Sequence, residues 1–398
     1  MRTELMQPRR CFLFAALAVL LFLGPCTQAQ TFSVIYSFTG GSDGGDSTAG
    51  LVNVGGNFFG TTTEGGAYGH GVVFEVSPTG QERVLYSFTG RADGATPDSG
   101  LLSIDGYLLG TTSAGGVFGA GTVFAITPQR KEVVLYSFTG GADGSGPQGG
   151  LVMDASGNLY GTTFSGGASG NGTVFELTRP KVISGAWSEQ VLHSFGTVPD
   201  GTNPVAGVTF DKTGNLYGTT SGGGTYSYGI VFQLKHSSSG WTENILHQFQ
   251  MQNDGGTPWA GIVVDASGNL YGAATQGGEG QDGGGTIFKL SPSRGAWSFE
   301  VINALSGWGI SGTERNLVLE KGTIFATTHC DGVASAGTVY ELSPSGNSWN
   351  YTQLYSFTGG VDGLFAVSTP AFEKQGNLWG TTRYGGANGW GVVFKIKL

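Results

Sequence analysis

The sequence predicts an all-β protein, a seven-bladed β-propeller, and three observations lead to this prediction. One pattern recurs seven times after the first thirty residues. Each copy holds four short β-like runs separated by turn residues. The two chain ends carry complementary parts of a single copy. A fixed period of this length is the signature of a repeat architecture.

The phase of the repeat is marked by the residue that closes one of its runs. Successive markers are 50, 50, 57, 54, 56 and 52 residues apart. The markers are Phe38, Phe88, Phe138, Phe195, Phe249, Leu305 and Phe357. The leucine is the one substitution in this series.

The third copy shows the four runs most clearly. They are Glu132–Phe138, Gly150–Asp154, Asn158–Thr163 and Gly172–Leu177. Val, Leu, Phe, Tyr and Thr dominate them, without the three-and-four apolar spacing of a helix. The Asp-Ala-Ser-Gly-Asn segment from Asp154 to Asn158 predicts a tight hairpin, because Gly and Asn accept positive φ. Four antiparallel strands per unit indicate a propeller blade. A β-solenoid fits less well, because each unit carries three hairpin-like reversals.

The chain ends test this architecture independently. After the leader, the chain begins with a lone run of the outermost type, Ser33–Phe38. It ends on a third-position run, Gly391–Leu398, so the last blade lacks its outer strand. Pairing the two runs would close the ring and cover an exposed sheet edge. We therefore expect one domain over residues 31–398.

Residues 1–29 read as a signal peptide. Arg9 and Arg10 supply a positive segment, and Phe12–Leu23 form an apolar run of twelve residues. Gly24 and Pro25 break this run, and small residues follow as far as Ala29. Twelve residues are too few to cross a bilayer core of ~30 Å as a helix. We expect export to the periplasm, the cell surface or the medium.

Composition and charge exclude several partner classes. The net charge is −9, and only 12% of residues are charged. No basic stripe is present to neutralise phosphates, which argues against nucleic acid and anionic membranes. Beyond the leader there is no second apolar span, and we expect a monomer. Cys330 is then the one remaining cysteine, so stability must come from packing and strand pairing.

The residues that recur in each copy resemble those of a known repeat family. The segments LYSFTGGADG, LYGTT and GTVFEL, with the Gly-Gly loop, are similar to the GloVer tandem repeat of choice-of-anchor bacterial surface proteins. The GLVMDASGNLY segment is more weakly similar to strands of NHL-type propellers. The resemblance implies an exported or surface-displayed bacterial protein and no particular chemistry.

Two recurrent loops are expected to converge on one face of the ring. One loop carries an Asp-Gly step in six copies, and its carboxylates are a candidate ring for calcium or a polyhydroxylated ligand. These aspartates are Asp43, Asp93, Asp143, Asp200, Asp254 and Asp362. The alternative, which we favour, is that Asp-Gly serves only to make turns. In the sixth copy Ser306–Gly309 replaces the step.

Aromatic side chains decorate the same loops and offer flat faces for sugars or peptides. Packing between blades is the equally weighted alternative. Together with one histidine, the candidate contacts are Tyr68, His70, Phe118, Tyr226, Tyr228, Trp259, Tyr384 and Trp390.

Other residues of chemical interest receive structural interpretations. His193 and His247 stand where other copies have tyrosine, and we expect them to replace it structurally. His329, Cys330 and Asp331 are potential metal ligands, but drift within one copy explains them better. Four tryptophans that begin the longer outer strands are expected to pin loops; these are Trp187, Trp241, Trp297 and Trp349.

The sequence thus favours an exported propeller that acts as a binding scaffold for a polysaccharide or a protein. No nucleophile triad, carboxylate pair or zinc signature is evident, so no catalytic residue, metal ligand or cofactor is assigned. Two alternatives stay open. One is a metal-assisted lyase or hydrolase whose polar side chains from several blades meet near the axis. The other is a structural envelope protein.

Overall fold

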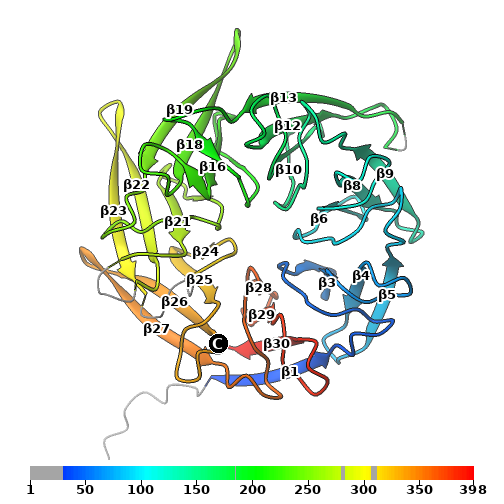
Figure 1. The fold of residues 1–398 in the computed structure, drawn as a ribbon. Helices are drawn as coiled ribbons and strands as arrows, with labels where there is room; N and C mark the ends of the chain where they lie inside the picture. The colour runs from blue at the N-terminus through cyan, green and yellow to red at the C-terminus, as the bar shows by residue number, and fades with distance from the viewer. Residues whose placement is uncertain (1–29, 184, 279–282, 306–311) are drawn as a thin grey trace, which may run out of the picture.

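A computed structural model describes residues 30–183, 185–278, 283–305 and 312–398. The predicted signal peptide and Ser306–Gly309 lie outside the described residues. The described part of the chain is all β, with seven four-stranded antiparallel sheets arranged as the blades of a ring (Figure 1). The seven-bladed propeller predicted from the sequence is confirmed.

The strands of the first four blades follow one another in chain order from the axis outward. Blade 1 comprises β2 (Val52–Val54), β3 (Asn57–Thr62), β4 (Val72–Val76) and β5 (Glu82–Ser87). Blade 2 comprises β6 (Leu102–Ile104), β7 (Tyr107–Thr112), β8 (Thr122–Ile126) and β9 (Glu132–Ser137). Blade 3 comprises β10 (Val152–Met153), β11 (Leu159–Thr163), β12 (Thr173–Thr178) and β13 (Ser188–Ser194). Blade 4 comprises β15 (Thr209–Phe210), β16 (Leu216–Thr220), β18 (Ile230–Ser237) and β19 (Gly240–Gln248).

The remaining blades also run from an inner to an outer strand. Blade 5 comprises β20 (Val263–Val264), β21 (Leu270–Ala274), β22 (Thr286–Ser293) and β23 (Ala296–Ala304). Blade 6 comprises β24 (Val318–Glu320), β25 (Thr323–Thr328), β26 (Thr338–Ser345) and β27 (Ser348–Ser356). Blade 7 comprises β28 (Ala371–Phe372), β29 (Leu378–Thr381), β30 (Val392–Lys397) and β1 (Thr31–Ser37). A small extra pair joins β14 (Gly201–Thr202) to β17 (Gly222–Gly223).

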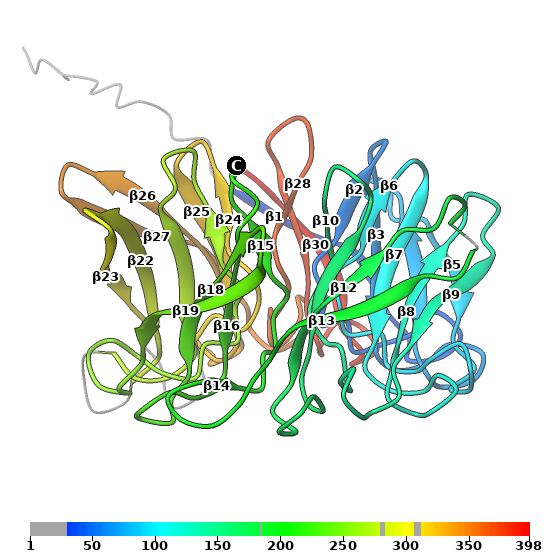
Figure 2. The ribbon, with the colours of Figure 1, turned by 90° about the horizontal axis from the view of Figure 1, so that it is seen from above.

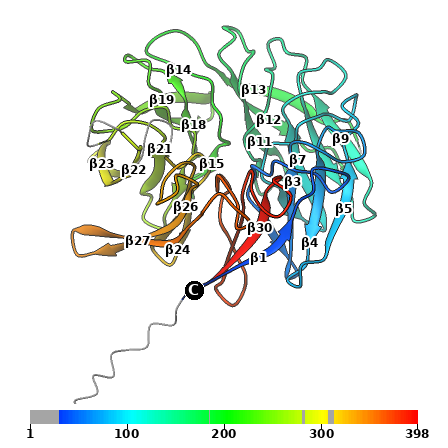
Figure 3. The ribbon, with the colours of Figure 1, turned by 60° about the horizontal axis from the view of Figure 1, so that its bottom comes forward.

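Blade 7 closes the ring from both chain ends, as predicted. β1 pairs with β30 antiparallel, from Thr31 opposite Lys397 to Ser37 opposite Val392, with one irregularity between Val34 and Tyr36. Figures 1 and 3 both show the blue β1 beside the red β30. The edge of β30 is therefore covered.

The phase-marking residues form the joints between blades. All seven are buried. Six of them are phenylalanines that meet, edge to face, a phenylalanine on the third strand of the next blade, with ring centroids 5.0–5.3 Å apart. In the pair Phe138–Phe175, for example, the separation is 5.1 Å. The repeat period thus reflects an aromatic contact that each blade makes with its neighbour.

The recurrent Gly-Thr-Thr of the second strand also has a physical cause. A side chain on Gly161 would place its Cβ 2.6 Å from the ring of Phe175, so only glycine fits. Buried Thr162 donates to the carbonyl of Ala206 in the next blade at 2.8 Å. Buried Thr163 accepts from the backbone N–H of Thr173. Blade 5 has alanines at both threonine positions.

Candidate functional site

A cavity of about 1030 Å³ opens at the centre of the ring, where the loops between blades converge with the loops between second and third strands. Figure 2 shows these loops along the lower face, which carries β14. Every blade contributes one side chain from the same position of the repeat. In blades 1 to 5 this position lies two residues before the glycine that precedes the inner strand, and in blades 6 and 7 another residue replaces that glycine. The seven contributors are Thr48, Asp98, Gln148, Val205, Trp259, Glu314 and Val367.

Three blades meet at Asp98 of this cavity. Its carboxylate accepts from the Arg315 guanidinium at 2.8 Å and from the hydroxyl of Thr48. Blade 2 carries the aspartate, whereas Arg315 comes from blade 6, so the ion pair crosses the axis. Nε of Arg315 is buried and has no hydrogen-bond partner. A smaller cavity of about 220 Å³ shares five lining residues with the larger one, among them Asp98, Trp259 and Arg315.

A second ion pair lies on the wall of the cavity. Arg383 of blade 7 binds both carboxylate oxygens of Asp46, at 2.8 and 3.2 Å. Asp46 precedes the inner strand of blade 1 and has a positive φ of 55°. Glu314 forms a third contact, with Nδ1 of His329. The cavity therefore combines two indole rings, of Trp259 and Trp390, with fixed carboxylates, guanidinium groups and hydroxyls.

The six Asp-Gly carboxylates are placed away from this cavity, since none is among its lining residues. Oδ2 of Asp43 accepts from the Tyr36 hydroxyl at 2.8 Å and from the backbone N–H of Thr39 at 2.9 Å. Asp93, Asp143 and Asp362 make the same contacts. Their oxygens hold the connection between blades together, and the predicted ligand role stays a prediction.

Histidine takes the place of tyrosine in two of these connections, as predicted. Nε2 of His193 lies 3.2 Å from Oδ2 of Asp200, and Nε2 of His247 lies 3.1 Å from Oδ2 of Asp254.

A glutamate on the neighbouring outer strand approaches four of the six aspartates. One carboxylate oxygen of each glutamate is buried without a hydrogen-bond partner; these are Glu82, Glu132, Glu189 and Glu243. Burial, followed by the charge of Asp43, raises the pKa of Glu82 to about 7. The same two causes, with Asp93 and Asp143 as the neighbours, raise the pKa of Glu132 and of Glu189 to about 7.

Six of the seven predicted aromatic contacts fall into two groups. Trp259 and Trp390 line the central cavity. Tyr68, Phe118, Tyr226 and Tyr228 are exposed on the loops, with 61%, 62%, 49% and 38% of their surface accessible. They are not among the residues that line the cavity.

Two of the loop residues and Tyr384 contact neighbouring loops. Trp390 covers Gly40, and His70 covers Gly90 in the same manner one blade further on. The ring of Tyr384 lies 6.2 Å from that of Phe365. A ligand role for each of these residues stays a prediction.

Three of the outer tryptophans pack against a tyrosine of the preceding blade, and only Trp187 contacts a loop as expected. The ring centroids of Trp297 and Tyr217 are 5.9 Å apart, and those of Trp349 and Tyr271 are also 5.9 Å apart. Trp241 lies 6.3 Å from Tyr160, and Trp187 donates to the carbonyl of Ile183.

Sequence reasoning missed six of the seven side chains that ring the cavity and found only Trp259. It also missed the four glutamates, although each stands six residues before a phase marker.

Among the described residues, one group of three side chains is placed so that it could hold a metal ion, namely His193, Asp200 and Glu243. The His329–Asp331 segment does not form such a group. No helix among the described residues is long and apolar enough to cross a membrane.

The fold and the position of the cavity together define the class of protein. It is a seven-bladed propeller with a central cavity at the loops that connect the blades. The chain belongs to the Gloeobacter/Verrucomicrobia repeat family, whose sequence model matches residues 24–186 and 182–394. This match confirms the tandem repeat that the sequence resembled. No curated protein matches the chain.

Solved structures that are similar to this chain are distant in sequence. An ancestral GH74 enzyme is 14% identical, with a TM-score of 0.58 over 89% of this chain and 48% of its own. Puromycin hydrolase is 12% identical, with a TM-score of 0.53 over 85% of this chain and 50% of its own. The chain thus spans about half the length of each. A glucose dehydrogenase is 15% identical, with a TM-score of 0.44 over 75% of this chain and 94% of its own. At these identities the similarity is one of fold alone.

Proposed function

We propose that the protein binds an oligosaccharide in the central cavity. The observation that carries the proposal is the composition of the ring of seven side chains, which surrounds about 1030 Å³. Trp259 supplies an aromatic face on which a sugar ring can stack. Asp98, Gln148 and Glu314 supply the acceptors and donors that hydroxyl groups require.

The preorganisation of these groups supports the same ligand class. Asp98 is held by Thr48 and Arg315, and Asp46 is held by Arg383. Fixed polar groups bind a ligand without the entropic cost of ordering flexible side chains. A mostly apolar peptide would cover these ion pairs and the unpartnered Nε of Arg315 without offering them hydrogen bonds, at a cost that disfavours it.

The test is calorimetric titration with a panel of soluble oligosaccharides. At least one glycan should bind, and Trp259→Ala should weaken it at least about tenfold, as expected for an aromatic anchor worth about 1.4 kcal/mol or more. Phe118→Ala is the control, because Phe118 is an exposed aromatic residue on a neighbouring loop and does not line the cavity. The proposal fails if no glycan binds, or if Phe118→Ala weakens binding while Trp259→Ala does not.

The meeting of three blades at Asp98 supports a second candidate, an enzyme that acts on a ligand in the same cavity. Such an enzyme needs polar side chains from several blades near the axis, and Asp98, Thr48 and Arg315 satisfy this criterion. In this case a bound glycan should be cleaved, and Asp98→Asn should abolish cleavage while the Phe118→Ala variant cleaves normally. Intact glycan after prolonged incubation would reject this candidate.

We also propose that the protein is exported, on the basis of Arg9, Arg10 and the apolar run Phe12–Leu23. Expression in a bacterial host followed by N-terminal sequencing should give a mature chain that begins near residue 30. A cytoplasmic chain that retains its leader would contradict this proposal.

A further inference from the structure

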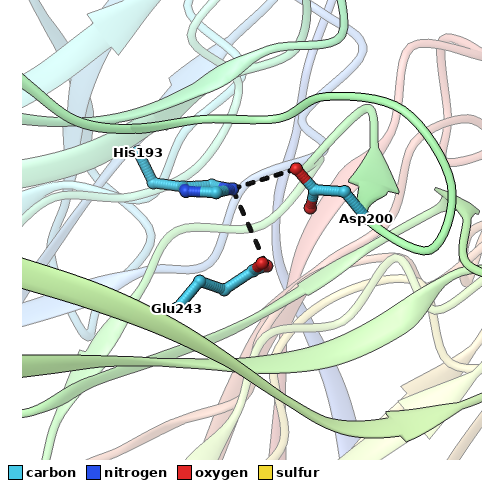
Figure 4. A group of neighbouring side chains, drawn as sticks. All are labelled: His193, Asp200 and Glu243. Atoms are coloured by element: carbon cyan, nitrogen blue, oxygen red, sulfur yellow. Dashed lines mark hydrogen bonds and ion pairs between the residues drawn. The ribbon is translucent and has the colours of Figure 1, made fainter.

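Three potential metal ligands converge at the junction of blades 3 and 4 (Figure 4). His193 lies at the end of β13, Asp200 in the loop that leads into blade 4, and Glu243 on β19. Nε2 of His193 is 3.2 Å from Oδ2 of Asp200 and 3.7 Å from Oε1 of Glu243. All three ligand atoms lie within 4.8 Å of one another.

The other blade junctions serve as internal comparisons. Three of them combine the Asp and Glu with tyrosine in place of His193, at Tyr36, Tyr86 and Tyr136. At the next junction His247 and Asp254 are present, but Phe299 occupies the glutamate position and stacks on His247 at 3.7 Å. Among the described residues, imidazole and both carboxylates therefore occur together only at His193.

The distinction matters because tyrosine and histidine differ as ligands. Burial and the neighbouring carboxylates raise the pKa of Tyr136, so its phenol stays protonated and can only donate to Asp143. A neutral imidazole instead offers a nitrogen lone pair, which Zn²⁺ and related ions bind readily. Replacing tyrosine by histidine at this one junction converts a hydrogen-bond donor into a metal ligand.

The geometry and charge of the site fit a divalent transition metal. Ligand bonds of about 2.0–2.2 Å in a tetrahedral site place donor atoms roughly 3.3 Å apart, close to the two separations from His193. Oε1 of Glu243 is buried and has no hydrogen-bond partner. Within the described residues neither Asp200 nor Glu243 pairs with a lysine or arginine. A bound cation would satisfy that oxygen and balance two partly buried carboxylates.

We propose that His193, Asp200 and Glu243 bind one divalent transition-metal ion, with Zn²⁺ as the matched example. Three protein ligands leave a fourth position for water. Because the ligands come from blade 3, the connecting loop and blade 4, the ion would tie the two blades together. The site is separate from the central cavity, since none of the three residues lines it.

The test is a titration of untagged, metal-free protein with Zn²⁺, followed by calorimetry and thermal unfolding. Wild-type protein should bind one ion and unfold at a higher temperature in its presence, because binding to the native state alone stabilises it. Glu243→Gln should weaken binding at least about tenfold. His193→Tyr should remove binding and still fold, because it recreates the arrangement found at Tyr36, Tyr86 and Tyr136.

His247→Tyr is the matched control, because it changes an equivalent histidine whose junction lacks the glutamate. It should bind Zn²⁺ like the wild-type protein. Substitution with Co²⁺ should give visible absorption bands that disappear in His193→Tyr. The proposal is overturned if wild-type protein binds no stoichiometric Zn²⁺, if it responds to Ca²⁺ but not to Zn²⁺, or if His193→Tyr binds as the wild type does.

Discussion

Replacing Glu82, Glu132 and Glu189 by glutamine should remove a pH dependence of stability built into the propeller. Each carboxyl lies partly buried beside an Asp-Gly aspartate, and burial together with that aspartate raises its pKa from 4.5 to about 7. A carboxyl that binds its proton more tightly in the folded state stabilises that state only while protonated. The contribution is thus fully present below pH 4.5 and is lost as the pH rises through about 7.

The magnitude follows from the size of the pKa shift. At about 1.4 kcal/mol per pKa unit, a fully buried glutamate would lose about 3 kcal/mol. These three carboxyls are only partly shielded from water, so screening reduces the loss to about 1–2 kcal/mol each. Three together should lower the free energy of unfolding by about 3–6 kcal/mol between pH 4.5 and pH 8.

The assay is denaturant unfolding of the wild type and the triple variant at several pH values. Comparing the two proteins cancels the contributions of His193, His247 and the aspartates, which both contain. The curves should coincide near pH 4.5, and the variant should be the more stable protein at pH 8. Glu300→Gln, at an exposed position of β23, should leave the wild-type slope unchanged. A triple variant that keeps the wild-type slope, or that is less stable at pH 8, would refute the reasoning.

Substitutions at two further positions test the joints between blades. Phe38→Ala should destabilise the protein by about 3–5 kcal/mol, because a buried ring that meets Phe74 at the closure junction is lost. Phe38→Leu should cost less, since Leu305 is native at the equivalent position; equal urea midpoints for both variants would contradict this. Thr162→Val should cost about 1–2 kcal/mol, because the buried carbonyl of Ala206 loses its donor. An unchanged urea midpoint would show that this bond between blades contributes nothing.

The fold was predictable because its determinants repeat. The phenylalanine at the end of each outer strand, the Gly-Thr-Thr of the second strand and the Asp-Gly turn recur in nearly every copy. The spare run Ser33–Phe38 matched the strand missing from the last copy, and β1 does pair with β30. The predicted inner strand Gly150–Asp154 is shorter in the structure, Val152–Met153.

The central cavity was not predictable in this way, because its chemistry lies in residues that differ between copies. Thr48, Asp98 and Glu314 occupy the same repeat position with different side chains. Asp98 and Arg315 are 217 residues apart, and no spacing rule connects them. The glutamates beside the aspartates did recur, six residues before four of the seven markers, but each aspartate lies in the loop that leads into the blade, far from its glutamate in the sequence. Only the ring geometry brings them together.

A crystal structure of the protein with an oligosaccharide that it binds would test the central claim most directly. Sugar density should lie in the central cavity, with one ring stacked on Trp259 and hydroxyl groups bonded to Asp98 or Glu314. Sugar bound instead on the outer strands, or only at the exposed loop residues Tyr68 and Phe118, would contradict the account.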